Sequence, residues 1–324
     1  MEEAKTYFDE VMALLDTLPE TEENRQRRIS LLVSEGEVFI LLLKIPEYYD
    51  LLTRCEPMAR GLGNPELLGA FFGRLGDCHF IFGHYDQAIE TLTKAVELCQ
   101  GAGNAEDAGR AYTYLSWSHS DRGDYDRVLA LKEDFLQTME QSFDVHSHTW
   151  VLSAASRACS SLGRWDQAIE EGRKALGVAE ESSDNSSITF AAWNLSIAYN
   201  WKGDSDMAIK YGELAVQKAP TPGDKAWAQR SLAWAWCRSG ETTRGIELLT
   251  TVLPIFRAGQ YITNEIDLTC FLGEGYWLAG QDDKARQTFE KGLEIAERCG
   301  ARYYIGFAQR LLGEIALKTN PTQA

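Results

Sequence analysis

The chain has no run of apolar residues approaching the roughly 20 that a membrane-spanning helix requires. Its first 16 residues are acidic and amphipathic, so they lack the basic start and apolar centre of a secretory signal peptide. The seven cysteines are odd in number and never stand in CxxC spacing, which argues against a disulfide framework. We therefore expect a cytoplasmic protein whose thiols are reduced and buried.

Positive charge is also scarce in this chain. It carries 48 acidic and 32 basic residues, which gives a formal net charge of −16. Such an acidic protein is repelled by phosphate backbones and by anionic lipids, so we expect neither nucleic acid nor a membrane as a partner. The hydrophobic content of 44% is ordinary for a folded protein and therefore predicts a continuous core.

Sequence signatures of enzymes are missing as well. There is no GxxxxGK[ST] motif, and the glycines do not follow strands, so a phosphate-binding loop is not supported. His146 and His148 stand near a helix start without a third ligand nearby, and we interpret them as solvent-exposed rather than as a metal site. His79 and His119 fall at buried aromatic positions. We predict no catalytic residue, no metal and no cofactor, and hence no enzyme.

What the chain does have is an internal repeat. A glycine is followed closely by an aromatic or small residue, an aspartate and an alanine or valine. The motif begins at Gly83, Gly123, Gly163 and Gly203, with weaker copies at Gly240 and Gly280. The glycines are 40, 40, 40, 37 and 40 residues apart, and a fixed period of this length indicates a solenoid. Each glycine can close one helix in the left-handed conformation, and the aspartate then favours the start of the next helix.

The repeat predicts that residues 1–324 form a single superhelical domain. Its expected parts are an opening helix at 1–18, a degenerate first repeat at 21–62, six regular repeats at 64–299 and an unpaired helix at 302–318. In the degenerate unit Leu43 stands where the period demands glycine, and one helix is expected from Asn24 to about Lys44. Irregular end units are typical of repeat proteins.

The packing positions carry a family resemblance. Aligning the corner glycines also aligns a large residue followed by a small one, with a ring or a cysteine three positions further on. Examples are Leu75-Gly76 with His79, Leu115-Ser116 with His119, and Leu195-Ser196 with Tyr199. This pattern resembles the tetratricopeptide repeat in its 40-residue form over residues 22–318. The resemblance implies an all-α, right-handed α-solenoid of about seven helix pairs flanked by single helices.

A narrower likeness concerns the last repeats. The segment Leu272–Gly280 and the segment Leu311–Ala316 look like the tetratricopeptide regions of bacterial ATPases and class III nucleotide cyclases used in signalling. In that family the repeats serve as a sensor or docking arm. An unpaired last helix would suit a region taken from a longer protein of this kind.

Large aromatic residues occupy positions that are expected to be exposed to solvent. Positions 13, 10, 6, 3 and 2 before each corner glycine lie opposite the buried stripe of the first helix, at 100° per residue. They hold Trp117, Trp150, Arg157, Phe190, Trp193, Ile197, Asn200, Trp201, Trp227, Arg230, Trp234, Arg238 and Trp277. The resemblance places this face on the concave side of the superhelix. Exposed apolar groups with tryptophan and arginine mark binding surfaces, although packing between neighbouring first helices is the alternative.

Arginines share this face. Arg110, Arg157, Arg230, Arg238 and Arg310 predict a cationic, aromatic groove inside an acidic shell. Such a groove suits a peptide segment or a small acidic effector that carries carboxylate or phosphate. The groove departs from the carboxylate clamp of chaperone-binding relatives. Lysine and asparagine are needed there, and this chain has Gly73, Thr113, Ser153, Trp193, Asp77 and Trp117.

We therefore predict a non-enzymatic protein- or peptide-binding module, the sensor or docking region of a bacterial signalling protein. The alternative is a homo-oligomeric assembly scaffold. In that case the groove is filled by another copy of the chain, as in a homodimer, or by its own N-terminal helix.

Overall fold

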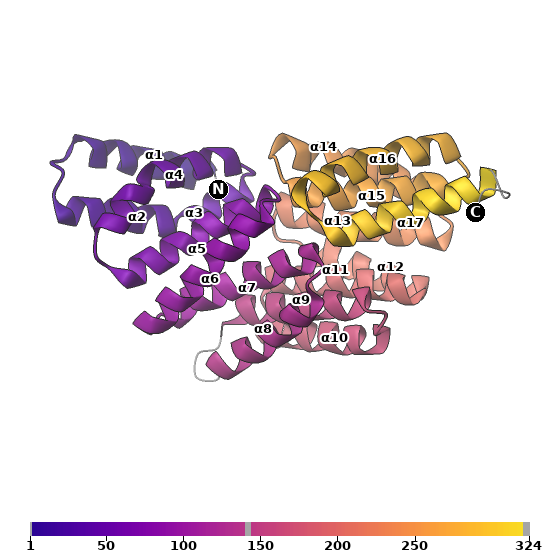
Figure 1. Ribbon diagram of the computed structural model, residues 1–324, viewed down its shortest axis with the longest axis horizontal. Coiled ribbons are helices and arrows are strands. Elements are labelled where there is room, and N and C mark those ends of the chain that lie inside the picture. The colour runs from indigo at the N-terminus through magenta and orange to yellow at the C-terminus, as the bar shows by residue number, and fades with distance from the viewer. Residues whose placement is uncertain (1, 140–143, 320–324) are drawn as a thin grey trace.

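The computed structural model of the chain describes residues 2–139 and 144–319, and these form an array of α-helices (Figure 1). The N-terminal helices are α1 (Glu2–Thr17), α2 (Glu22–Ser34), α3 (Gly36–Leu41), α4 (Ile45–Gly61), α5 (Pro65–Ile81), α6 (Tyr85–Ala102), α7 (Ala105–Arg122) and α8 (Tyr125–Thr138). The remainder are α9 (Val145–Ser161), α10 (Trp165–Glu181), α11 (Asn185–Lys202), α12 (Ser205–Lys218), α13 (Pro222–Ser239), α14 (Thr242–Ala258), α15 (Ile262–Leu278), α16 (Asp282–Cys299) and α17 (Arg302–Thr319).

Consecutive helices pack in antiparallel pairs, and each pair stacks on the next. The first helix of a repeat also contacts the first helix of the following repeat, as α7, α9, α11 and α13 do in turn. Within the described residues α2 pairs with α4, with the short α3 between them, and the helices from α5 to α16 make six further pairs, so that α1 precedes seven pairs and α17 follows them. The predicted all-α solenoid is confirmed. No helix in the described part of the chain has the length and apolar composition needed to cross a bilayer.

Local sequence explains where the helices begin and end. Asn64 and Asn104 accept hydrogen bonds from backbone N–H groups in the first turns of α5 and α7, and Pro65 and Pro222 occupy first helical positions. The corner glycines have φ between +71° and +101°, at Gly83, Gly123, Gly163, Gly203, Gly240 and Gly280. The predicted left-handed corners are therefore confirmed, because only glycine adopts this conformation without strain.

The degenerate first repeat departs from the prediction. A single helix was expected up to about Lys44, but α2 ends at Ser34 and the short α3 follows. The Tyr48 hydroxyl donates to the Leu32 carbonyl at 2.7 Å, and a Cβ at Gly36 would lie 2.3 Å from that hydroxyl oxygen. The insertion of Tyr48 at this point accounts for the break. Leu43 takes the corner position with φ of +57°.

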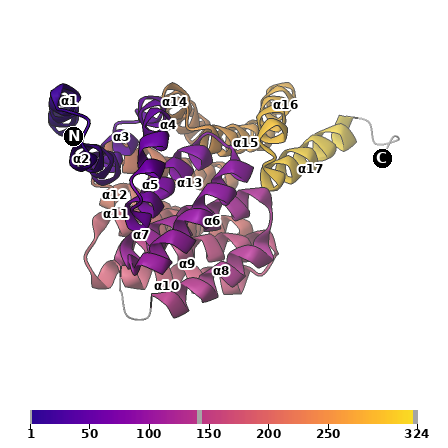
Figure 2. The same cartoon turned by 60° about the vertical axis from the view of Figure 1, so that its left-hand side comes forward.

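The superhelix closes on itself. Helix α17 contacts α7 and α15 contacts α5, although these helices are far apart in sequence (Figures 1 and 2). The Tyr261 hydroxyl donates to the Ile40 carbonyl at 2.7 Å, and Arg157 donates to the Tyr304 hydroxyl at 2.5 Å. The concave side is consequently an enclosed space rather than an open trough.

Candidate functional site

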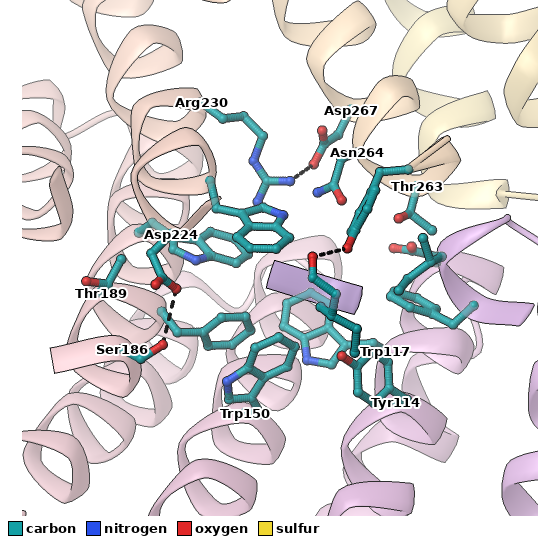
Figure 3. Close-up of a pocket in the computed structure, with 18 of the residues that line it drawn as sticks. Tyr114, Trp117, Trp150, Ser186, Thr189, Asp224, Arg230, Thr263, Asn264 and Asp267 are labelled. Atoms are coloured by element: carbon teal, nitrogen blue, oxygen red, sulfur yellow. Dashed lines mark hydrogen bonds and ion pairs between the residues drawn. The ribbon is translucent and has the colours of Figure 1, made fainter. Parts of the chain in front are cut away.

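A cavity of about 110 Å³ lies on the concave side, where the first helices converge. Helices α5, α7, α9, α11, α13 and α15 supply most of its wall, and α3 and α17 contribute at its two ends. Figure 3 shows Trp117 and Trp150 in the lower part of the view, Arg230 and Asp267 in the upper part, and Asp224 with Ser186 at the left. The wall therefore combines aromatic rings with charged and polar side chains that converge on one space, as in a candidate ligand site.

Seven of the thirteen predicted site residues line this cavity. They are Trp117, Trp150, Arg157, Phe190, Trp193, Trp227 and Arg230. The 40-residue period brings them together, because equivalent positions on successive first helices face the same axis. Counting back from the corner glycines was sufficient to find them.

The aromatic rings of the cavity contact one another. Trp150 and Phe190 are stacked, with centroids 3.7 Å apart and an interplanar angle of 11°. Phe190 meets Trp193 edge to face at 4.9 Å and Trp117 at 5.7 Å. These rings therefore do pack between neighbouring first helices, as the alternative interpretation of the sequence expected. They form a continuous wall, and the remaining space lies beside it.

The expectation of an exposed face was wrong. Trp117 and Trp193 are each only 4% exposed, because they pack on each other and on Phe190 and are covered by arginine side chains of neighbouring first helices. Trp150 and Trp227 remain partly exposed, as does Ser186. These three lie near the N-terminal ends of their helices, so the cavity opens to solvent on that side.

Six predicted site residues do not line the cavity. They are Ile197, Asn200, Trp201, Trp234, Arg238 and Trp277. Helix α17 covers part of this group: Phe307 meets Trp201 at 5.6 Å and Trp234 at 6.5 Å. Trp234 is also stacked on Phe271 at 4.2 Å and fully buried. Periodicity could not show that the last helix folds back into the groove.

The opening helix does not occupy the groove. Phe8 of α1 packs edge to face on Phe39 at 5.0 Å, and no α1 residue lines the cavity. Within the described chain the segments that enter the concave side are α3, through Glu37 and Ile40, and α17, through Tyr304. The space that remains is therefore not filled by the N-terminal helix.

The predicted cationic groove was also wrong, because carboxylates neutralise its arginines. Arg110 lies 2.9 Å from Glu37 and 3.0 Å from Asp77. Arg157 pairs with Asp121 at 3.1 Å, Arg230 pairs with Asp267, and Arg238 pairs with Glu274 at 2.8 Å. Arg310 is outside the cavity and pairs with Glu314 of its own helix.

A signal for these partners was present in the sequence. Asp77 and Glu274 lie six residues before their corner glycines, Asp121 lies two before and Asp267 thirteen before. These are the same concave positions that predicted the tryptophans and arginines. Counting all charged residues there, and not only the basic ones, would have predicted a neutralised wall.

Burial and pairing shift the proton equilibria of the wall. Burial raises the pKa of Asp267 to about 6 against the opposing charges of Arg230 and Arg157. Burial likewise raises the pKa of Asp121. Burial would also raise the pKa of Glu37, but the Arg110 charge and hydrogen bond outweigh it and the pKa is lowered.

His146 was expected to be solvent-exposed, and the structure places it elsewhere. It lines the cavity and lies on the Trp150 ring with centroids 4.9 Å apart. Burial, and then the Arg110 charge, lower its pKa. The ring is therefore a neutral, partly buried component of the wall at neutral pH.

Sequence reasoning missed several polar groups of the cavity. With its side-chain oxygen directed at α13, Asn264 accepts from Trp227 Nε1 at 3.2 Å and from Arg230 at 2.7 Å. Asp224 accepts from the Ser186 hydroxyl at 3.1 Å and from the Thr221 hydroxyl at 2.6 Å. Both residues stand earlier in their helices than the positions counted from the corner glycine, so that rule did not reach them.

The stacked helix pairs and the corner geometry define a solenoid built of tetratricopeptide units. A model of the tetratricopeptide repeat matches residues 67–141. Residues 67–141 are thus tetratricopeptide repeats, as the packing residues predicted, and the helix pairs on either side continue the same packing. No curated protein matches it by sequence.

Solved structures share the fold at low sequence identity. A Rap protein complexed with competence and sporulation factor is 16% identical, with a TM-score of 0.62 over 98% of this chain and 93% of that one. The Rap conjugation gene regulator of plasmid pLS20 in complex with the Phr* peptide is 12% identical, with a TM-score of 0.70 over 87% and 78%. A STAND protein with a tetratricopeptide repeat sensor from Pyrococcus horikoshii is 14% identical, with a TM-score of 0.49 over 99% and 53%.

Proposed function

We propose that this protein is a non-enzymatic binding module that holds part of a peptide in its concave cavity. The observation that carries the proposal is the cavity of about 110 Å³, walled by Trp150, Phe190, Trp193 and Trp227 and open toward the N-terminal ends of the first helices. Repeat proteins use their concave surfaces for binding. Two solved structures of the same fold, at TM-scores of 0.62 and 0.70, are complexes with competence and sporulation factor and with the Phr* peptide.

The wall offers a donor for such a ligand. The indole N–H of Trp117 is buried and donates no hydrogen bond in the described part of the chain. A buried donor without a partner costs free energy, and a peptide carbonyl in the cavity would satisfy it. Trp117 lines the cavity, and we propose that a group bound there reaches this donor.

The chemistry of the wall favours binding over catalysis. The carboxylates of Asp121 and Asp267 are held in ion pairs with arginines, and the Ser186 hydroxyl donates to Asp224. Within the described residues no hydrogen bond joins His146 to Ser186, and a nucleophile requires a base within reach. We propose a sensor or docking role in a bacterial signalling protein of the cytoplasm, where the free cysteine thiols stay reduced.

A library of short random peptides tests this function. Peptides selected on the full chain should quench its tryptophan fluorescence and compete with one another for one site. Trp150→Ala and Trp227→Ala should weaken binding by about tenfold or more, because both rings line the cavity while only partly buried.

Trp277→Ala is the matched control, since Trp277 is partly buried but lies outside the cavity. Its affinity for the selected peptides should equal that of the unmodified chain. Equal losses in all three variants, or selected peptides that do not compete, would refute a binding site in the cavity.

A further inference from the structure

The charges that line the cavity do not balance. Four carboxylates belong to the wall, those of Glu37, Asp121, Asp224 and Asp267, whereas three arginines face them. The three arginines pair one to one with Glu37, Asp121 and Asp267. The Asp224 carboxylate is the one left over.

No other group of the wall supplies the missing positive charge. No lysine lines the cavity. His146 is the remaining basic group, and burial together with the Arg110 charge lowers its pKa, so it is neutral at neutral pH. Arg110 also contacts the buried carboxyl of Asp77, whose pKa burial raises well above its usual value, so Asp77 is not counted in this balance. The space therefore has an excess of negative charge.

Asp224 is buried and held in a fixed orientation. It is 9% exposed, and the hydroxyls of Ser186 and Thr221 donate to its two oxygens at 3.1 and 2.6 Å. Its position in the first turn of α13 also favours a negative charge. Neutral hydroxyls and a helix terminus stabilise a carboxylate without cancelling its charge, and each oxygen retains capacity for a second donor.

Asp107 makes the same capping contacts as Asp224 in another repeat, but its carboxylate has a cationic side chain beside it. Asp107 stands at the same position of α7, three residues after the cap Asn104. It lies outside the cavity and has Arg74 3.7 Å away. Asp224 has no cationic group within 4 Å in the described part of the chain.

The aromatic wall next to Asp224 is suited to a cation. The protein's own guanidinium groups already lie over these rings: Arg230 is 4.4 Å from the centroid of Trp193, and Arg157 is 5.3 Å from that of Trp117. Trp227 follows Asp224 by one helical turn and faces the same cavity. Indole faces attract cations, most strongly where water is excluded.

We propose that the cavity binds an organic cation, a primary ammonium or guanidinium group on a short carbon chain, with the Asp224 carboxylate as its counter-ion. Asp224 and Ser186 both line the cavity, and Figure 3 shows the hydrogen bond between them. The volume of about 110 Å³ is smaller than the roughly 150 Å³ that holds benzene, which limits the ligand to a short, narrow alkyl chain. The inference rests on the proposed function and specifies the chemistry of its ligand. The proposed ligand is cationic, whereas the arginines in the sequence had led us to expect an acidic effector.

Three probes of nearly equal size test the charge. Binding of n-butylammonium, n-butanol and butyrate is followed by tryptophan fluorescence of the full chain at constant ionic strength. We expect saturable binding of n-butylammonium and at least tenfold weaker binding of the other two, because a charge-assisted hydrogen bond and the aromatic contacts are lost. Equal binding of all three, or preference for butyrate, would overturn the proposal. This comparison requires no variant.

Asp224→Asn then locates the cation, and Asp107→Asn is its control. Asparagine retains the shape and the acceptor for a hydroxyl but removes the charge. Asp224→Asn should weaken the binding of n-butylammonium about tenfold or more and leave the binding of n-butanol unchanged. Asp107→Asn should change the affinity for neither probe. Circular dichroism establishes that both variants fold. Unchanged affinity in a folded Asp224→Asn variant would refute the assignment.

A final comparison identifies the source of the cation. It also distinguishes failure of the cation site from failure of the proposed peptide-binding function. Nα-acetyl-lysine N-methylamide binding more tightly than n-butylammonium indicates a side chain of a peptide, and the reverse order indicates a free amine. Both orders support the cation site. Selected peptides that are neutral or acidic and bind in the cavity would refute the cation and retain the peptide-binding function. If the amine binds in an Asp224-dependent way but no peptide binds, the peptide-binding function is refuted and the cation site is retained.

Discussion

At the scale of single residues, the concave wall consists of buried ion pairs as well as rings. Arg230 and Asp267 are 2% and 2% exposed, and their side chains pair across neighbouring repeats. Removing one partner of such a pair leaves the other charge buried without compensation. These pairs fix the register of adjacent first helices, whereas the exposed pairs contribute little.

Arg230→Met should therefore lower the free energy of unfolding by about 3–5 kcal/mol at pH 7.5. The loss should be smaller near pH 5, because Asp267 has a pKa of about 6 even beside Arg230 and is protonated there. Urea denaturation at both pH values measures the difference. Arg310→Met is the control, since its pair with Glu314 is exposed and its loss should cost below about 1 kcal/mol. A pH-independent cost would contradict this account.

His79 gives a second residue-scale prediction. Burial, with a smaller contribution from His84, lowers its pKa from 6.5 to about 4. Between these values the unfolded chain binds the proton and the folded chain does not, so stability rises with pH across this window. Allowing for partial solvent screening, we expect His79→Phe to remove about 2 kcal/mol of that rise. Urea unfolding of both proteins at pH 4 and pH 7 measures this difference. If the free energy of unfolding falls by the same amount from pH 7 to pH 4 in His79→Phe and in the unmodified chain, the account of His79 is contradicted.

At the scale of helices, corner geometry was predictable and helix placement was not. Gly83 and Gly163 were assigned to left-handed corners from sequence alone, and both have φ above +70°. That Gly83 also touches Cys299 could not be predicted, because the contact joins corners 216 residues apart and depends on the pitch of the whole superhelix. For the same reason the sequence identified the rings of the cavity but not α17, which buries Trp234.

The two corners provide a matched pair of substitutions. Gly163→Ala has open space around the new Cβ, so it should cost about 1–2 kcal/mol for the left-handed conformation alone. Gly83→Ala has the same φ but places its Cβ 2.7 Å from Cys299 Sγ, and its cost should be larger by at least about 1 kcal/mol. Thermal and urea unfolding compare them. Equal costs would mean that the contact between corner and α16 is not formed.

At the scale of the whole molecule, closure distinguishes this protein from an open solenoid. In an open array each repeat contacts only its neighbours, and stability is a sum of local contributions. Here Tyr261 joins α3 to the start of α15, and Tyr304 joins α17 to α9. These contacts couple distant repeats and enclose the space that the ligand is proposed to occupy.

Tyr304→Phe tests this coupling. The substitution removes the hydrogen bond from Arg157 while Arg157 keeps its pair with Asp121, so the cost should be about 1.5–3 kcal/mol. If closure couples the repeats, amide hydrogen exchange should accelerate in both α17 and the end of α7, which lie side by side, and remain unchanged in α10 on the outer side. Acceleration confined to α17 would show that the last helix is an independent cover. The closed superhelix requires the paired response, because α17 and α7 are held against each other.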